Sequence, residues 1–115
     1  MRSLFLWQKL LLNIYLVNSL FLKVDILPKA LEVIEAVADF VEEKNTQGSG
    51  KRFFENFLSA IEKLAIPNVE YAICHHHTLA FHKYSCSHFN DWVIAFKIDS
   101  NALTVYEIVY GANLA

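Results

Sequence analysis

The spacing of hydrophobic residues changes at Pro67, and the change indicates the class of fold. Between Pro28 and Pro67, apolar residues recur every three or four positions, which is typical of amphipathic helices. After it, they recur at every second position, which is typical of strands with one buried face. Helices followed by a run of strands predict an α+β fold, with the helices on one face of a largely antiparallel sheet.

Two helices are predicted before Pro67. The first is expected from about Pro28 to Lys44 and the second from about Ser49 to Ala65, with Ser49 or Gly50 as the cap. The short Gly/Ser-containing connection between them predicts an antiparallel helix hairpin. The buried stripes that the spacing predicts are Leu31, Ile34, Val37, Ala38, Phe40 and Val41 in the first helix and Phe54, Phe57, Leu58, Ile61, Leu64 and Ala65 in the second.

One strand is predicted before the helices, and three or four are predicted after them. In the strongest of these, the even-numbered residues from Trp92 to Ile98 share one face, while Val93, Ala95 and Lys97 share the other. The turn-forming residues at 99–101 predict that this strand pairs with the last one as a hairpin. The expected strands are Leu20–Ile26, Val69–Cys74, Leu79–Tyr84, Trp92–Ile98 and Leu103–Val109.

Residues 1–19 are expected to be an extension to a single domain at residues 20–115. They form either an added helix, with Trp7, Leu11 and Ile14 at helical spacing, or a stretch upstream of a natural start near Val17. Polar residues interrupt the stretch, which argues against a membrane span, and a small-residue cleavage site of the secretory type is poorly formed. The protein is therefore expected to be cytoplasmic, without stable membrane insertion.

Composition limits the functional classes. The chain has 115 residues, 55% of them hydrophobic, and a net charge of −2, so overall charge does not steer it toward nucleic acid. Its two cysteines, Cys74 and Cys86, cannot form a disulfide framework of the secreted kind. They are expected to be reduced, half-buried thiols on neighbouring strands, where an incidental bridge is conceivable. No Gly-rich phosphate loop or Cys-x-x-Cys pair is present, so no cofactor is predicted.

The order of these elements resembles the RelE/ParE superfamily of toxins from bacterial type II toxin–antitoxin systems, also known from plasmid stabilisation. The resemblance covers residues 20–115, and its specificity comes from the order and spacing of several individually weak motifs. The segments that carry it are Ile26–Ala30, Gly50–Phe54 with Ala60–Leu64, Asn90–Ile98 and Leu103–Gly111.

The resemblance implies a toxin that a cognate antitoxin holds inactive by laying a helix or extended segment over its surface. It also implies two activities. RelE-like members are mRNA interferases, which cut messenger RNA in the ribosomal A site without a metal, whereas ParE-like members poison DNA gyrase and are not nucleases. A degenerate, non-toxic binding module that uses the helix surface is the remaining alternative.

Metal-free RNA cleavage needs a base, an acid and a cation, and the expected catalytic residues are His88, Asp91, Lys83 and Tyr110. A histidine shortly before the Asp91–Trp92 pair resembles the YafQ-like ribonuclease branch. That branch also has a histidine near the C-terminus, which is missing here. The basic cluster of the RelE branch is missing too, since only Lys83 and Lys97 lie near these positions.

The run His75–His77 is the remaining feature with chemical potential. Successive strand residues alternate faces, so only His75 and His77 can converge on one ion, with His82 or Cys74 as a further ligand. A solvated loop is the simpler interpretation, and no metal site is predicted.

Overall fold

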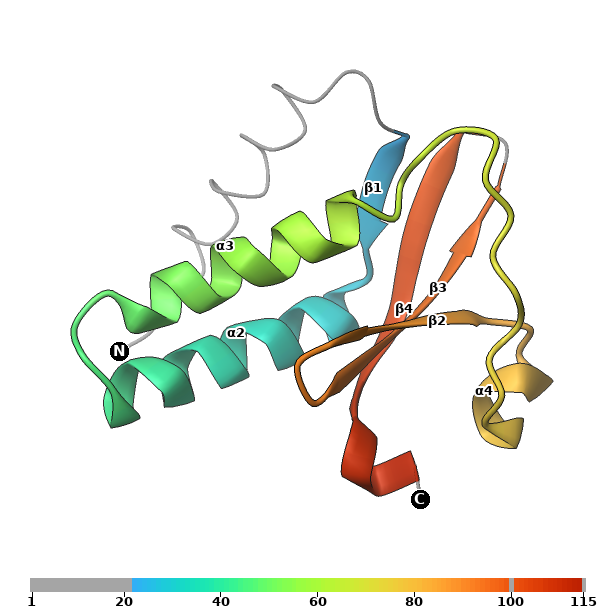
Figure 1. The fold of residues 1–115 in the computed structure, drawn as a ribbon. Coiled ribbons are helices and arrows are strands. Elements are labelled where there is room, and N and C mark those ends of the chain that lie inside the picture. Colours follow the sequence, from blue (N-terminus) through green and yellow to red (C-terminus); the bar gives the residue numbers. More distant parts are fainter. Residues whose placement is uncertain (1–21, 100, 115) are drawn as a thin grey trace.

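The computed structural model describes residues 22–99 and 101–114, and the predicted N-terminal helix lies outside them. Within this range the chain is α+β, as predicted. The elements in chain order are β1 (Lys23–Ile26), α2 (Pro28–Lys44), α3 (Ser49–Glu62), α4 (His77–Phe81), β2 (Ser85–Phe89), β3 (Trp92–Ile98), β4 (Ala102–Tyr110) and a 3-10 helix, η1 (Gly111–Leu114) (Figure 1).

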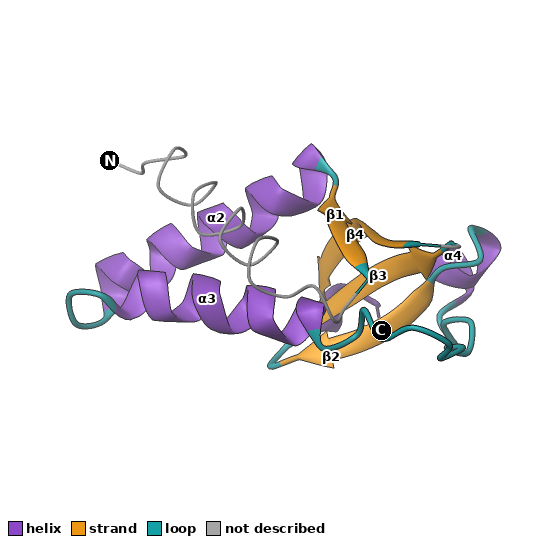
Figure 2. Ribbon diagram, turned by 90° about the horizontal axis from the view of Figure 1, so that it is seen from above, coloured by secondary structure: helices purple, strands orange, loops and turns teal. Residues whose placement is uncertain are grey.

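The four strands form one mixed sheet in the order β1-β4-β3-β2. β1 runs parallel to β4, and the other two pairings are antiparallel. The predicted hairpin of the last two strands is confirmed, with Trp92 opposite Tyr110 and Ile98 opposite Leu103. The pair α2 and α3 lies on one side of the sheet and α4 on the other (Figure 2).

The helix hairpin brings α2 and α3 into close contact at Gly50. A Cβ atom there would lie 2.5 Å from the carbonyl oxygen of Ala38, so only glycine permits this approach. The residue that caps α3 is Gly48, in the left-handed conformation at φ 89°, rather than the predicted Ser49 or Gly50. The Glu42 carboxylate of α2 accepts the backbone N–H groups of Gly48 and Gly50 and supplies the capping interaction.

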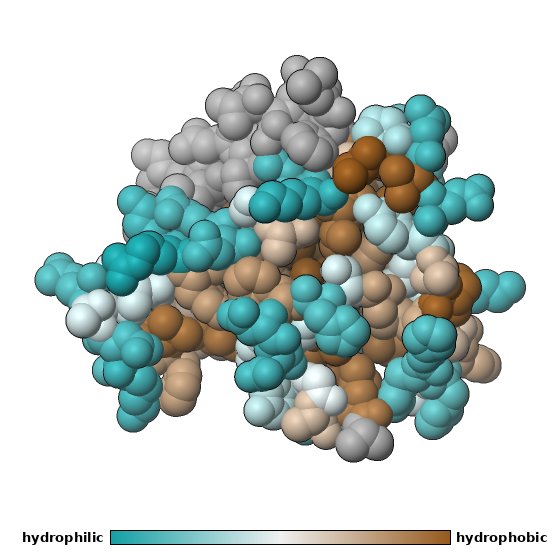
Figure 3. Space-filling view, in the orientation of Figure 1, coloured by the Kyte–Doolittle hydropathy of each residue, from teal (hydrophilic) through white to brown (hydrophobic). Residues whose placement is uncertain are grey.

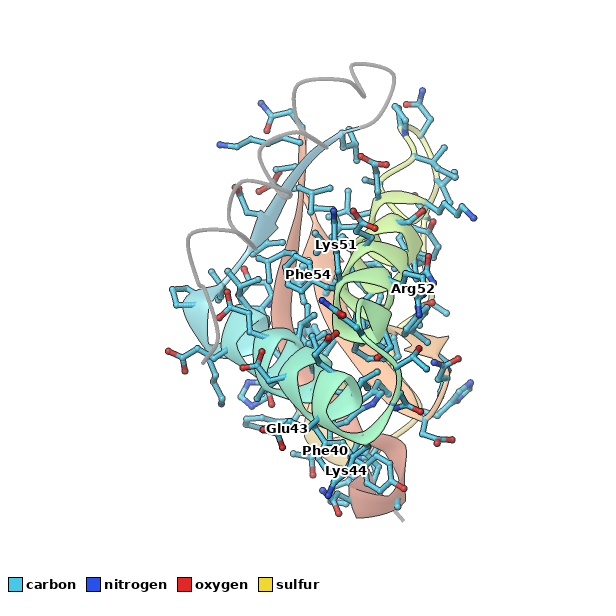
Figure 4. The ribbon with its side chains drawn as sticks, turned by 90° about the vertical axis from the view of Figure 1, so that its left-hand side faces the viewer. Phe40, Glu43, Lys44, Lys51, Arg52 and Phe54 are labelled. Carbon is cyan, nitrogen blue, oxygen red and sulfur yellow. A yellow bond between two sulfur atoms is a disulfide. The ribbon has the colours of Figure 1, made fainter. Side chains whose placement is uncertain are left out.

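The larger core lies between the helix hairpin and the sheet, where the predicted alternation of β3 is confirmed. Ile94 and Phe96 pack against Ile34, Phe54 and Phe57. The predicted burial of Phe40 is wrong, because 59% of this side chain is exposed and Lys44 lies over its ring (Figure 4). The predicted burial of Ile34 and Ala38 is confirmed, and Ala30 and Glu35 are the other buried residues of α2.

Two predicted strands after Pro67 are wrong. Residues 69–74 form no strand and make only one isolated bridge, between Ile73 and Ser85 at the start of the edge strand β2. Residues 79–84 form the end of α4 and a turn, which the hydrogen bond from the Tyr84 N–H to the Leu79 carbonyl closes. Leu79 is buried against the sheet while Phe81 is 81% exposed, so the apparent alternation does not mark a strand face. The true strand, β2, follows this turn.

Candidate functional site on the open face of the sheet

The face of the sheet turned away from α2 and α3, here called the open face, carries the polar side chains of interest. Its strand residues pack a small second core, in which Val93 and Ala95 contact Leu79 of α4, Cys74 and Tyr84. In the space-filling view, apolar surface at the sheet end of the molecule is interrupted by hydrophilic side chains (Figure 3). The strand residues of the open face include both apolar side chains, Val93 and Ala95, and polar ones, His88 and Lys97.

An aromatic and cationic cluster occupies one part of the open face. The rings of Tyr84 and Tyr106 stack with centroids 5.1 Å apart, and Lys97 Nζ lies 5.5 and 5.6 Å from the two centroids. The ring of His82 stacks on Tyr84 at 5.3 Å. Burial, with a smaller contribution from the nearby Glu107 charge, raises the pKa of Tyr84, so its phenol stays neutral at physiological pH. Tyr84 itself is buried between the other two rings, so the rings that the cluster leaves accessible beside the positive charge are those of His82, which is exposed, and Tyr106, which is partly exposed.

A cavity of about 280 Å³ lies beside β2 on the same face. Residues 71–76 form one wall, and Leu79, Cys86, His88, Val93 and Leu114 complete it. Three histidines thus gather from two separate segments of the chain. All three line the cavity; His75 and His88 are exposed, whereas His76 is partly buried.

A disulfide between Cys74 and Cys86 forms part of the cavity wall, with Cα atoms 5.1 Å apart. The prediction that both cysteines are reduced is therefore wrong. The segment before α4 runs beside β2, where Ile73 pairs with Ser85 and the Cys74 N–H donates to the Tyr84 carbonyl. These two contacts place the thiols opposite each other. The expected position of the two cysteines on neighbouring strands left such a bridge conceivable, but the periodicity, which misplaced β2, did not predict it.

The four predicted catalytic residues do not converge on one point. His88 is exposed on the open face, opposite Val93 in the sheet. Tyr110 lies on the helix-covered face, where its ring contacts Trp92 at 5.4 Å. Asp91 is exposed in the β2–β3 turn, and its carbonyl accepts the Gly111 N–H at 2.7 Å. Among the described residues, no hydrogen bond or ion pair joins His88 to Asp91.

The fourth predicted residue, Lys83, is exposed in the turn between α4 and β2, at φ 63°. Lys97, by contrast, lies on the open face, as the predicted alternation of its strand requires. Its two tyrosine partners were not predicted as a cluster with it. Tyr84 reaches Lys97 only through the turn after α4, which sequence periodicity does not identify.

The histidine run is not arranged as the metal hypothesis required. His77 lies in α4 and does not line the cavity, while its ring stacks on His76 at 5.0 Å. Cys74 is bonded to Cys86 and has no thiolate to offer a metal. In the described part of the chain, no group of three or more His, Cys, Asp or Glu side chains is placed to hold an ion.

Comparison of the chain with models of protein families, with curated proteins and with solved structures gives no match. Within residues 22–99 and 101–114, no helix is both long and apolar enough to cross a membrane. The function of the open face has to be inferred from its own side chains.

Proposed function

We propose that this protein is a toxin of the RelE/ParE type that cleaves RNA on the open face of its sheet without a metal. The observation that supports cleavage is the presence of two exposed histidines, His75 and His88, in the lining of one cavity. The order of a strand, a helix hairpin and three antiparallel strands agrees with the family resemblance of the sequence. The expected partners are an antitoxin protein and messenger RNA, the latter on the ribosome.

Two imidazoles can supply the acid and base that metal-free RNA cleavage requires. One takes the proton of the ribose 2′-OH, whose oxygen attacks the adjacent phosphorus. The bond from phosphorus to the 5′-oxygen breaks, and the other imidazole protonates the leaving oxygen. The products are a 2′,3′-cyclic phosphate and a 5′-hydroxyl end, so no oxidant or external reagent is needed.

The aromatic and cationic cluster would hold the RNA strand beyond the cleavage point. Lys97 lies four residues along β3 from Val93, the cross-strand neighbour of His88, which places it roughly 13 Å away at the usual rise of a strand. At this separation Lys97 does not act on the same phosphate as His88. It can pair with a neighbouring phosphate while unstacked bases lie against exposed aromatic rings.

The test is to induce the protein in a bacterial host and to map new RNA ends, with purified ribosomes and a chelator in a parallel reaction. We expect growth arrest and cleaved messages, both lost in His88→Ala. The matched control is His77→Ala, which removes an exposed histidine outside the cavity.

Two outcomes would contradict the proposed activity. Growth arrest with intact messages and broken DNA would indicate a gyrase-directed toxin. Normal growth, with no gene for a small antitoxin beside this one, would indicate a non-toxic binding module.

A further inference from the structure

The Cys74–Cys86 disulfide lies beside the cavity on the open face, at one edge of the sheet. Cys86 belongs to β2, the edge strand in the order β1-β4-β3-β2, and it is partly exposed. Cys74 is 7% exposed, and both cysteines line the cavity of about 280 Å³. Neither cysteine belongs to the larger core between the helix hairpin and the sheet. Cys86 is therefore the more accessible end of the bridge.

The lining of the same cavity includes two exposed histidines, His75 and His88. His75 directly follows Cys74 in the chain, and His88 lies two positions after Cys86 on the same face of β2. Among the described residues, no aspartate or glutamate lines the cavity. A protonated imidazole near a thiol favours the thiolate, the form that attacks and departs in disulfide exchange. The lining therefore offers a sulfur positive charge, and no carboxylate opposes it.

The bridge also connects the irregular segment of residues 71–76 to the sheet. Other contacts hold this segment to the start of β2, namely the pairing of Ile73 with Ser85, the Cys74 N–H donated to the Tyr84 carbonyl and the Ser85 hydroxyl donated to the Tyr71 carbonyl. These contacts end at residue 85 of β2. The disulfide is thus the covalent link between the cavity wall and the strand, one residue farther along.

We propose that Cys74–Cys86 is a redox-active disulfide, which a dithiol reductant opens in the folded protein with the help of His75 and His88. A thiolate of the dithiol attacks the Cys86 sulfur, and the bond between the two cysteine sulfurs breaks. Cys74 leaves as a thiolate and takes a proton from an imidazole or from water. The second thiol of the dithiol then attacks its own mixed disulfide, so that Cys86 leaves as a thiol and the dithiol is oxidised to a cyclic disulfide.

Opening the bridge removes the covalent link between residues 71–76 and β2, so we expect this wall of the cavity to move away from the strand. Because His75 lies on the wall and His88 on β2, reduction separates the two histidines. The larger core contains neither cysteine and stays folded. The bridge is thus a redox-sensitive latch on the cavity, and this inference does not depend on the proposed RNA cleavage.

The kinetics of reduction test whether the exchange takes place in the folded protein. The oxidised full chain is mixed with dithiothreitol, and the free thiols are trapped by alkylation and counted by mass. We expect a rate that is proportional to the dithiothreitol concentration and that changes by less than about threefold between 0 and about 1 M urea. Each molar of urea favours unfolding of a small domain by about fivefold or more, so acceleration beyond threefold would mean that the chain must unfold first and would overturn the inference.

The part assigned to the imidazoles is tested in the same assay. His88→Ala should slow the reduction about threefold at about pH 7, because the sulfurs lose a nearby positive charge. His77→Ala is the matched control, since His77 does not line the cavity and its loss should not change the rate. Equal rates in the two variants would overturn the role of the histidines. The reduction of the unaltered chain requires no variant, so misfolding of one variant does not leave the exchange itself undecided.

Amide hydrogen exchange of the oxidised and the reduced chain tests the latch. We expect exchange of the hydrogen-bonded Cys74 amide to rise at least about tenfold on reduction, while the buried helix residues Phe54 and Phe57 keep their protection. The double variant Cys74→Ala/Cys86→Ala should behave like the reduced chain without any reductant. Unchanged exchange at position 74, or loss of protection in α3, would overturn the latch.

None of these measurements uses RNA, so the two proposals can fail separately. A chain that exchanges its disulfide but cuts no RNA would keep the latch and remove the ribonuclease. A chain that cuts RNA but is reduced only after unfolding would keep the ribonuclease and remove the latch.

Discussion

Glu42 stabilises the start of α3 from a neighbouring helix, a role that short-range sequence patterns do not reveal. Its carboxylate oxygens accept the N–H groups of Gly48 and Gly50 at 2.9 and 2.8 Å. These hydrogen bonds, the one from Gly48 first, hold the pKa of Glu42 below its ordinary value. Because the pKa is lower in the folded state, the interaction stabilises the fold above the ordinary pKa and is lost as the pH falls through the folded value.

Replacing Glu42 with glutamine should therefore destabilise the protein at pH 7, because glutamine keeps one acceptor oxygen and loses the charge. The difference in the free energy of unfolding between the variant and the wild type should shrink below about pH 4.5. In that range Glu42 of the unfolded wild-type chain becomes protonated, so unfolding takes up a proton and the wild type loses its advantage. Urea unfolding at pH 7 and at about pH 3.5 measures this difference at both pH values. The control is Glu43→Gln at the exposed neighbouring position. A difference that does not change with pH would contradict the assigned role.

The substitution Gly50→Ala, which adds one methyl group, tests how closely the two helices must approach each other. An alanine there would place its Cβ 2.5 Å from the Ala38 carbonyl oxygen and 2.9 Å from Glu42 Cβ, so the helices would have to separate. We expect Gly50→Ala to lower the free energy of unfolding by about 1–3 kcal/mol, as overpacking does. Lys51→Ala, at an exposed position of the same helix, should change it by less than about 0.5 kcal/mol. Similar losses in the free energy of unfolding for both variants would show that the close approach of the helices at Gly50 does not contribute to stability.

At the scale of elements, a helix or strand could be predicted from the sequence where it buries one regular face, because its apolar residues then recur at a fixed spacing. α2 was predicted with its observed bounds, and β3 and β4 were predicted to within one residue, because each buries one regular face. The segment from residue 66 to residue 84 has no such face. It is held by the hydrogen bond from the Tyr71 hydroxyl to the Leu64 carbonyl, by Leu79 and by the disulfide, and none of these contacts repeats along the chain.

The Cys74–Cys86 bridge should contribute strongly to the stability of this segment. It closes a loop with a sequence separation of 12, for which the lost freedom of the unfolded chain corresponds to about 3 kcal/mol. Adding dithiothreitol should lower the free energy of unfolding by about that amount and should expose amide protons of α4 to exchange first. The control is the double variant Cys74→Ala/Cys86→Ala, which should not respond to the reductant. An equal response in the double variant would assign the effect to something other than this bridge.

For the whole molecule, the sequence predicts on which face of the sheet a strand residue lies, but it does not predict which residues of different segments meet on that face. The alternation of β3 correctly places Lys97 on the face opposite Ile94 and Phe96. Strand pairing separates the predicted catalytic residues, because His88 and Tyr110 lie on opposite faces. The histidine cavity depends on how the irregular segment folds back over β2, and that is a tertiary contact without a local sequence signal.

The distribution of charge over the whole molecule gives a prediction about RNA binding. The chain has a net charge of −2, and from residue 64 to residue 114 its basic residues other than histidine are Lys83 and Lys97. If the open face contacts RNA phosphates through these two lysines, the logarithm of the binding constant should fall with the logarithm of salt concentration at a slope of about −1.4. Binding should then weaken only about sevenfold between 50 and 200 mM salt.

Fluorescence anisotropy of a labelled oligoribonucleotide at several KCl concentrations and pH 8 measures this slope. Lys97→Ala should reduce its magnitude by about 0.7, whereas Lys51→Ala on the helix hairpin should not change it. A slope steeper than about −3 would mean that a different, more basic surface binds the RNA. A slope unchanged in Lys97→Ala would remove the aromatic and cationic cluster from the binding surface, because a single contributing lysine has to appear in the salt dependence.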